Sequence, residues 1–290
     1  MTRPHVAISA ALLVLLLRCT AAKSTIGNHG ISSSFCNISD IIVNPPQYDF
    51  YLTPVTDVPS VLTVTIDGIA HAFDAIFGGA LGDTTFPSCR LQTWRDGVSF
   101  TFNAFAPISP ASSIQGFLPF IVLQLGIENN DTRPHAVSLA FSMQCGGGFC
   151  NSSSRSGLIV NPDGSQLLSF NDSIWVGAKG LGADSVHTCV NNVTLCANAS
   201  AVVAPREAGR VTLVVGHYAS TGRYAAAYPL VENLWHMALI EEDALAAAHA
   251  SFVAAIPTVG IPDVDIAQRW FLTAPILLTK GVGNTSLTMG

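Results

Sequence analysis

The chain has 290 residues, of which 49% are hydrophobic and only 11% are charged, with a formal net charge of −6. This apolar composition allows a sizeable buried core and excludes an intrinsically disordered chain. Only three lysines occur and no basic stripe is present, so nucleic acid is excluded as a partner.

The N-terminus has the features of a secretory signal peptide. Arg3 precedes an apolar run of 12 residues, Val6 to Leu17, and Thr20-Ala21-Ala22 supplies the small residues that signal peptidase prefers. A membrane-spanning helix needs about 20 apolar residues, so an uncleaved anchor is disfavoured. We expect cleavage after residue 22 and a secreted chain without a stable transmembrane anchor. The remaining chain would have 11 basic and 19 acidic residues, a net charge near −8.

Seven Asn-x-Ser/Thr sequons follow the expected signal, the acceptor pattern for N-linked glycans. They are Asn37, Asn130, Asn151, Asn171, Asn192, Asn198 and Asn284. Sequons behind a signal peptide support one another, although a chain rich in serine, threonine and asparagine produces some by chance. We expect a glycoprotein.

Cysteine usage indicates disulfide bonds. Besides Cys19 in the expected signal, the cysteines are Cys36, Cys89, Cys145, Cys150, Cys189 and Cys196. Short spacings favour Cys145–Cys150 and Cys189–Cys196 as small loops, which leaves Cys36 with Cys89, but other pairings stay open. The competing interpretation is a zinc site, disfavoured because His187 is the only histidine nearby. We expect neither a metal nor a cofactor.

The run from Arg95 to Cys145 alternates apolar and polar residues, the pattern of half-buried strands. Strands are indicated at Val98–Ala104, Ile121–Ile127 and Val137–Met143. The polar stretch Asn129–Pro134 between the last two is typical of a hairpin loop. Three consecutive strands predict an antiparallel meander.

Shorter strands flank this run. Leu62–Ile66 and Ile69–Phe73 are expected to form a hairpin around Asp67-Gly68. Others are expected at Leu158–Val160, Leu167–Phe170, Ile174–Val176 and Val211–Val215, separated by turn formers. About nine strands without βαβ alternation predict a mainly β chain, with one large antiparallel β-sandwich over residues 23–228.

A helical extension is predicted for residues 229–290. An alanine-rich run ended by Pro257 favours a first helix, and one face of it would carry Leu234, Ala238, Leu245, Ala248 and Phe252. A second short helix is expected over Asp263–Leu272, and Gly281–Gly290 is expected to be frayed.

Several short phrases occur in a fixed order. Gly78-Gly79-Ala80-Leu81-Gly82 precedes Cys89-Arg90-Leu91-Gln92, then Phe105-Ala106-Pro107-Ile108-Ser109-Pro110, then a strand that opens at Pro119 and closes on Glu128-Asn129. Over roughly residues 75 to 145, and more loosely up to Trp270, the chain resembles the N-terminal β-supersandwich domain of the non-lysosomal glucosylceramidase family and related six-hairpin glycosidases. The resemblance implies linker helices after the supersandwich.

In that family the catalytic carboxylates lie in an (α/α)6 barrel after the β-domain, and 290 residues leave no room for one. The resemblance therefore implies a secreted, glycosidase-like accessory domain, non-catalytic alone, that packs against or substitutes for a missing barrel. No catalytic residue carries over, and whether the chain is an enzyme stays open. The alternative is a free-standing carbohydrate-binding or cell-surface interaction module, with a carbohydrate or glycoconjugate as partner.

Carbohydrate contact is predicted where the sheet gives way to the helix. An aromatic ring can cover the apolar face of a sugar while polar neighbours bond its hydroxyls. The candidates are His217, Tyr218, Arg223, Tyr224, Tyr228 and Trp235. The competing interpretation is packing of the helix on the sandwich, which is favoured. Trp94-Arg95-Asp96 is a weaker candidate and is typical of a turn before a strand.

Two acidic groups have competing interpretations. Glu241-Glu242-Asp243 offers carboxylates for glycoside hydrolysis, but adjacent helical residues point in different directions, so a solvated helix face is expected. Asp263 and Asp265 fall short of the about six to eight oxygens that calcium takes, so a helix cap is expected. The glycines of Gly78–Gly82 are expected to allow a tight turn with positive φ rather than to bind a nucleotide.

Overall fold

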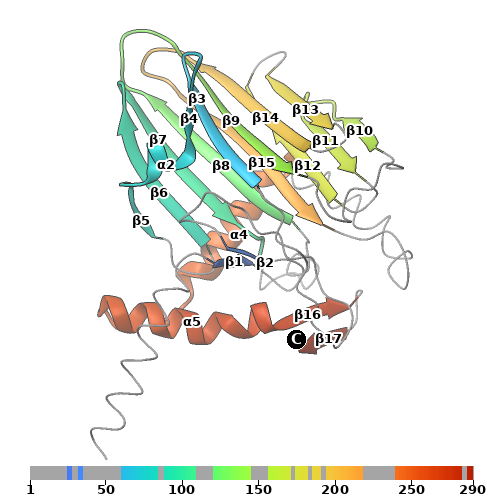
Figure 1. Cartoon of the computed structure of the whole chain (residues 1–290). Helices are drawn as coiled ribbons and strands as arrows, with labels where there is room; N and C mark the ends of the chain where they lie inside the picture. The colour runs from blue at the N-terminus through green and yellow to red at the C-terminus, as the bar shows by residue number, and fades with distance from the viewer. Residues whose placement is uncertain are drawn as a thin grey trace, which may run out of the picture.

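The computed structural model describes residues 25–27, 32–34, 60–83, 88–108, 120–144, 156–170, 174–181, 185–190, 194–217, 239–282 and 286–289. Two large antiparallel sheets pack face to face, and two helices follow them in sequence (Figure 1). The mainly β fold class, an antiparallel sandwich with a C-terminal helical extension, is confirmed.

The larger sheet has eight strands. In spatial order they are β10 (Ser156–Val160), β11 (Gln166–Phe170), β12 (Ile174–Lys179), β15 (Ala208–His217), β8 (Phe120–Asn129), β7 (Val98–Phe105), β6 (Ser88–Arg95) and β5 (Leu81–Asp83). The smaller sheet has five, in the order β13 (Val186–Val190), β14 (Thr194–Val203), β9 (His135–Gln144), β3 (Ser60–Ile66) and β4 (Ile69–Ala72). All nine predicted strands are present in these two sheets.

Two short pairs lie outside the sandwich, β1 (Thr25–Gly27) with β2 (Ser32–Ser34) and β16 (Thr279–Val282) with β17 (Ser286–Met289). The expectation of a frayed end over Gly281–Gly290 is therefore wrong for the described residues, because the last of them pair in a hairpin.

The alternating apolar residues of both sheets meet in one core. Phe100, Phe102 and Leu125 of the larger sheet and Leu139 and Phe141 of the smaller sheet are all at most 1% exposed and belong to the same buried cluster. Phe73, the expected end of a strand, instead begins the short helix α2 (Phe73–Phe77). Its ring meets that of Phe102 edge to face at 4.7 Å, so α2 extends the core.

The predicted meander is half right. β7 and β8 pair antiparallel, but β9 lies in the other sheet, between β3 and β14. The stretch after Asn129 is thus a crossing between sheets and not a hairpin loop. The period-two alternation determines which face of each strand is buried, but not which strand is its neighbour. The apolar faces of β8 and β9 can be buried side by side in one sheet or opposite each other in two sheets.

The hairpin turn expected at Asp67-Gly68 is present, and a second Asp-Gly hairpin turn occurs at Asp96-Gly97. Asp67 and Gly68 join β3 to β4 with φ of 49° and 82°, and Asp96 and Gly97 join β6 to β7 with φ of 51° and 82°. Trp94-Arg95-Asp96 accordingly lies at a turn. In contrast, none of the glycines in Gly78–Gly82 has a positive φ. Gly82 instead allows β5 to lie close to the backbone of β6, because a Cβ at this position would collide with the carbonyl of Arg90.

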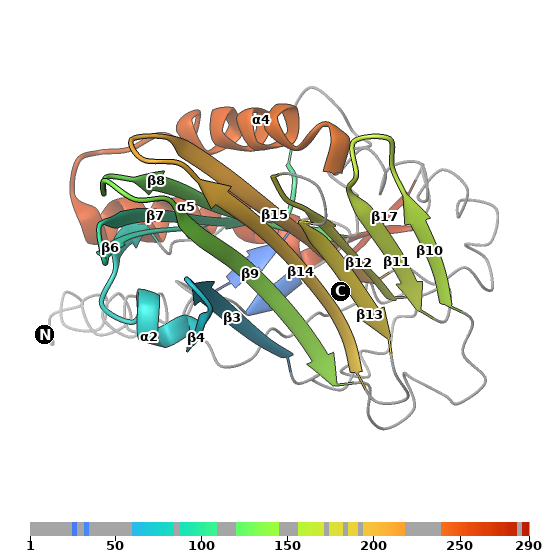
Figure 2. The same cartoon turned by 90° about the horizontal axis from the view of Figure 1, so that it is seen from above.

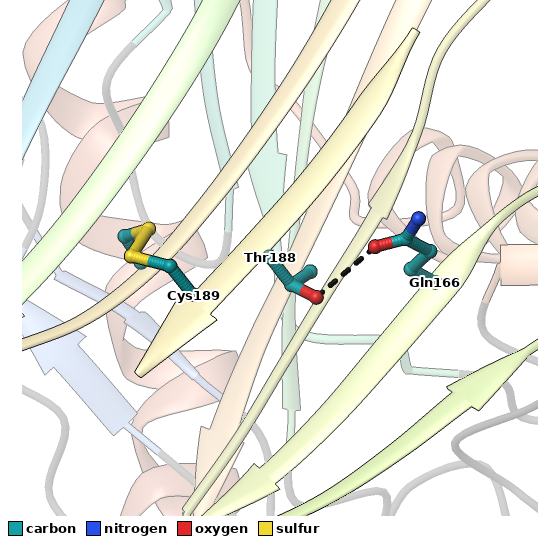
Figure 3. The surroundings of a disulfide bond; sticks show 4 residues. Gln166, Thr188 and Cys189 are labelled. Carbon is teal, nitrogen blue, oxygen red and sulfur yellow. Dashed lines mark hydrogen bonds between the residues drawn. A yellow bond between two sulfur atoms is a disulfide. The ribbon is translucent and has the colours of Figure 1, made fainter. Parts of the chain in front are cut away.

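The Cys189–Cys196 disulfide is confirmed, and it joins directly paired residues of β13 and β14 (Figure 3). Beside it, the Thr188 hydroxyl donates to Gln166 Oε1 at 3.1 Å, which ties β13 to β11 of the larger sheet (Figure 3). Cys89 is also disulfide-bonded, and its partner lies outside the described residues. Cys36, Cys145 and Cys150 lie outside them too, so their pairings stay predictions.

Asn129 lies where two of the chain crossings between the sheets meet, the β8–β9 connection (the first crossing) and the β14–β15 connection (the second crossing). Its side chain is 2% exposed and donates to the carbonyls of Arg133 (2.8 Å) and Val203 (2.9 Å), on the β8–β9 and β14–β15 sides respectively. Its Oδ1 accepts from the Asp131 N–H at 2.9 Å. Its backbone also contacts the β14–β15 connection: the Asn129 N–H donates to the Glu207 carbonyl, and the Asn129 carbonyl accepts from the Arg206 N–H.

A buried histidine reinforces the same end of the sandwich. His135, which opens β9, is fully buried, with Nδ1 2.9 Å from Asp67 Oδ2 and Nε2 3.2 Å from Asp131 Oδ2. The pKa of Asp67 lies below its ordinary value: desolvation opposes this, but the hydrogen bonds from Ala136 and His135 and the charge of Arg133 outweigh it. The β3–β4 turn is thereby tied to the first crossing.

We predict that Asn129→Ala lowers the free energy of unfolding by about 2–4 kcal/mol, because the buried Val203 carbonyl and the part-buried Arg133 carbonyl lose their donor and each such loss costs about 1–3 kcal/mol. Urea unfolding at neutral pH measures this. The matched control is Asn103→Ala, whose side chain makes one long hydrogen bond of 3.4 Å and should cost less than about 1 kcal/mol. Equal losses in the two variants would contradict the role given to Asn129.

Candidate functional site

The outer face of the larger sheet carries side chains in rows, because residues paired across neighbouring strands lie side by side. One row is almost wholly apolar and contains Phe105, Val122, Val214, Gly177 and Leu167. The next row along the strands is polar and contains Arg90, Asn103, Gln124, Thr212 and Lys179. Two environments therefore adjoin on one sheet face.

Helix α4 (Glu242–Ala254) covers the apolar row and lies across the outside of the sheet (Figure 2). Just before the helix, Leu239 packs on Gly177, where a Cβ would come within 2.9 Å of its Cδ1. Midway along the helix, the His249 ring stacks on Phe105 with centroids 4.9 Å apart. Leu245, between them, is buried as predicted, whereas Ala248 and Phe252 are only partly buried. The other two predicted face residues, Leu234 and Ala238, lie outside the described residues.

Charges fasten the first turn of α4 to the polar row. Glu242 is 4% exposed, and its Oε1 accepts from Arg210 Nη2 at 3.2 Å and lies 3.5 Å from Lys179 Nζ. Asp243 also pairs with Arg210, at 2.6 Å, and this hydrogen bond lowers the pKa of Asp243. The expected solvated face is therefore wrong for Glu242, because the helix begins directly over two cations of the sheet.

A cavity of about 500 Å³ lies between the C-terminal half of α4 and the sheet. Its lining consists of Ser88, Arg90, Thr101, Asn103, Gln124, Gly126, Arg210, Ala246, His249, Ala250, Val253 and Ala254. Its size falls within the range of small-molecule sites. No carboxylate belongs to this lining, which is polar on the sheet side and apolar along most of the helix side.

Buried polar atoms in the cavity wall have no hydrogen-bond partner in the described part of the chain. They are Arg210 Nε, Gln124 Nε2 and both ring nitrogens of His249, and the Gln124 and His249 side chains are 5% and 3% exposed. Such groups are costly to bury unpaired, so native proteins rarely leave them so. Burial lowers the pKa of His249 to about 4, so at neutral pH its uncharged ring offers one donor and one acceptor.

Of the six predicted carbohydrate residues, His217 alone lies in the described part of the chain, and it does not belong to the cavity lining. His217 is the last residue of β15 and pairs with Ile174. It lies seven residues from Arg210 along the strand, roughly 20 Å at the usual rise. The other five, Tyr218, Arg223, Tyr224, Tyr228 and Trp235, lie outside the described residues. The cavity itself was missed, because it depends on strand register and on the path of α4.

Two of the seven sequons lie in the described residues. Asn130 is exposed beside the first crossing, and its Nδ2 donates to the Ser99 hydroxyl at 3.0 Å. Asn198 is half-buried in β14. Glycosylation stays a prediction for both, as it does for Asn37, Asn151, Asn171, Asn192 and Asn284.

The second acidic pair lies in the first turn of a helix, where carboxylates are favoured. Helix α5 (Pro262–Leu278) begins one residue before Asp263, and the Asp265 carboxylate accepts from the N–H groups of Val259 (2.6 Å) and Gly260 (3.1 Å). Among the described residues, no cluster of His, Cys, Asp or Glu could hold a metal ion. In the same part of the chain, no helix combines the length and apolar character needed to cross a membrane.

Comparison with known proteins identifies no family: no family model and no curated protein matches the chain. Solved structures overlap it at low identity. One described as "Putative kojibiose phosphorylase from human microbiome" has a TM-score of 0.46 at 9% identity, covering 88% of this chain and 36% of its own. A heparinase III gene product (TM-score 0.33, 12% identity) covers 54% of this chain and 23% of its own.

A polysaccharide lyase has a TM-score of 0.33 at 11% identity and covers 66% of this chain and 33% of its own. This chain thus spans about a third or less of the length of these structures. Scores this low carry no argument about family or function, which therefore depend on the sequence resemblance and on the site.

We predict that acid destabilises the fold through His249. Its pKa falls from 6.5 to about 4 on folding, so the unfolded chain binds the proton more tightly. The stability is complete above pH 6.5 and falls by up to about 3 kcal/mol as the pH drops to 4. His249→Phe keeps an aromatic ring on Phe105 and should flatten the dependence of Tm on pH in that window. His187→Gln, at an exposed histidine, should leave the dependence unchanged, and an unchanged slope in His249→Phe would refute the assignment.

We also predict that Glu242→Gln lowers the free energy of unfolding by about 2–4 kcal/mol, because two cations lose a buried counter-charge. The neighbouring Glu241→Gln is the matched control, since Glu241 is exposed and makes no ion pair in the described residues. Urea unfolding of the two variants measures the difference. Similar midpoints would show that the ion pairs do not fasten α4.

Proposed function

We propose that this chain is a secreted, non-catalytic β-domain of a glycosidase-like protein, with residues 23–228 as the sandwich and residues 229–290 as an extension that contacts a helical catalytic barrel. The sequence resemblance over residues 75 to 145 supports the class of protein. The structural support is an exposed apolar stripe on α5, beyond the helix that is fastened to the sheet.

The stripe consists of Val264, Phe271 and Leu272, which are 44%, 57% and 53% exposed. They are spaced by seven and eight residues, so they share one face of α5. Ile261, just before the helix, is also exposed at 57%. Grouped apolar side chains on a surface mark an interaction site. In Figure 1, α5 lies beyond the end of the sandwich.

The acids near the cavity support a non-catalytic role. Glycoside hydrolysis requires two carboxylates placed on either side of the scissile bond. Glu242 and Asp243 both pair with Arg210, and neither belongs to the cavity lining. Their arrangement fits attachment of the helix better than acid and base catalysis.

Sequencing of full-length transcripts across the codon for Gly290 tests the domain role. We expect a long open frame that encodes an alternating helical pattern. The two catalytic carboxylates of the barrel would then be sought in that downstream sequence. A stop codon directly after Gly290 in full-length message would contradict the proposal.

The stripe on α5 predicts that the isolated chain self-associates as concentration rises. Phe271→Gln with Leu272→Gln should reduce this association while leaving Tm nearly unchanged, because both side chains are exposed. Size-exclusion chromatography with light scattering measures it. Val202→Thr, at a side chain 71% exposed on β14, is the control and should not change the association. Equal association of the double variant and the parent chain would remove the stripe as the interface.

The second candidate function is a free-standing carbohydrate-binding module. The cavity under α4 favours it, because unpaired buried amide and imidazole groups suit sugar hydroxyls. The aromatic candidates Tyr218 and Trp235 remain predictions. Glycan-array binding that disappears in Tyr218→Ala and Trp235→Ala would assign them a role, while binding that persists would direct attention to the cavity.

A further inference from the structure

We propose that the cavity under α4 binds a sugar that carries a carboxylate, a uronic acid or its glycoside, with Arg90 facing the carboxylate. This inference rests on the carbohydrate-binding candidate and names its ligand class. Three features of the wall lead to it: its charge, its unpaired polar atoms and its shape.

The charge comes from two arginines in the lining. Arg210 is engaged by the carboxylates of Glu242 and Asp243. Arg90 is exposed in β6 and makes no ion pair in the described part of the chain. A guanidinium forms two parallel hydrogen bonds with a planar carboxylate. Since no carboxylate belongs to the cavity lining, an anionic ligand meets a cation there without a competing charge.

The unpaired polar atoms suit hydroxyl groups. Gln124 Nε2 can only donate, while the two nitrogens of the uncharged His249 ring supply one donor and one acceptor. Asn103 already holds the other end of Gln124, since its Nδ2 donates to Gln124 Oε1 at 3.4 Å, and this fixes which amide atom faces the cavity. A sugar hydroxyl both donates and accepts, so neighbouring hydroxyls could satisfy both residues.

The lining sets a polar floor on the sheet against an apolar wall on the helix, which suits a pyranose ring with polar edges and C–H faces. Ala246, Ala250 and Val253 form the helix side, with short side chains that fit the C–H face of a sugar. Gly126 deepens the floor, and a Cβ added there would meet nothing nearer than 3.5 Å. A larger residue at Gly126 would therefore occupy cavity space without a backbone clash.

Isothermal titration of the full secreted chain with D-glucuronate, D-glucose and acetate tests the inference. We expect D-glucuronate to bind at least about tenfold more tightly than either D-glucose or acetate, because only it offers both the carboxylate and the hydroxyls. Arg90→Gln should weaken D-glucuronate binding about tenfold, the size of one charge-assisted contact. Arg206→Gln removes an exposed arginine remote from the cavity and should have no effect.

Gly126→Val is the second variant, and it should abolish binding of D-glucuronate while leaving Tm unchanged or higher. Equal binding of D-glucuronate and D-glucose, both lost in Gly126→Val, would overturn the acidic-sugar inference but leave carbohydrate binding in place. Binding that survives both Gly126→Val and Arg90→Gln would overturn the cavity as the site. If neither D-glucuronate nor D-glucose binds in the millimolar range, both the acidic-sugar inference and the carbohydrate-binding candidate are overturned.

Discussion

The hydrogen bonds of the Asn129 side chain are the constraint on which the sandwich depends. The β8–β9 and β14–β15 connections are two of the places where the chain passes between the two sheets, and Asn129 bonds residues of both. Because the crossings are held together, the apolar faces of β8 and β9 lie opposite each other and the core of Phe100, Leu125 and Phe141 can close. His135 adds the β3–β4 turn to the same assembly.

The register that builds the core also builds the outer face of the larger sheet. Residues that alternate with core positions, such as Asn103 and Gln124, would ordinarily be solvated. Gln124 is nevertheless buried, because α4 covers the neighbouring apolar row and closes off part of the polar row. The same helix is fastened through Glu242 at its first residue and through His249 near its middle. Attachment of the helix and formation of the cavity are thus one arrangement.

Local pattern sufficed for the strands with large alternating side chains and for helices α4 and α5, since burial of one face dictates the period. It missed α2, whose first residue was expected to end a strand. It failed for β14, where the buried positions include Ala197, Ala199 and Ala201, because alanine gives little contrast with the polar residues between. It also could not choose the neighbour of β9. The cavity escaped prediction for a related reason: Arg90 and Gln124 are distant in sequence and become neighbours only through pairing across β7.

One signal of the cavity was present in the sequence. His249 lies in an alanine-rich helix whose buried face would be expected to carry only apolar residues. Its position seven residues after Glu242 places both polar groups on the face that meets the sheet. Glu242 and His249 therefore indicate that the buried face of α4 packs against polar residues of the sheet.

The lengths of the strands have a consequence for assembly. The central strands β8, β9, β14 and β15 have 10 residues each, whereas the edge strands β5, β4, β10 and β13 have 3, 4, 5 and 5. Short edges present few unpaired backbone N–H and C=O groups to another chain. Side-by-side addition of sheets, the first step towards amyloid-like aggregation, therefore finds little template on this sandwich.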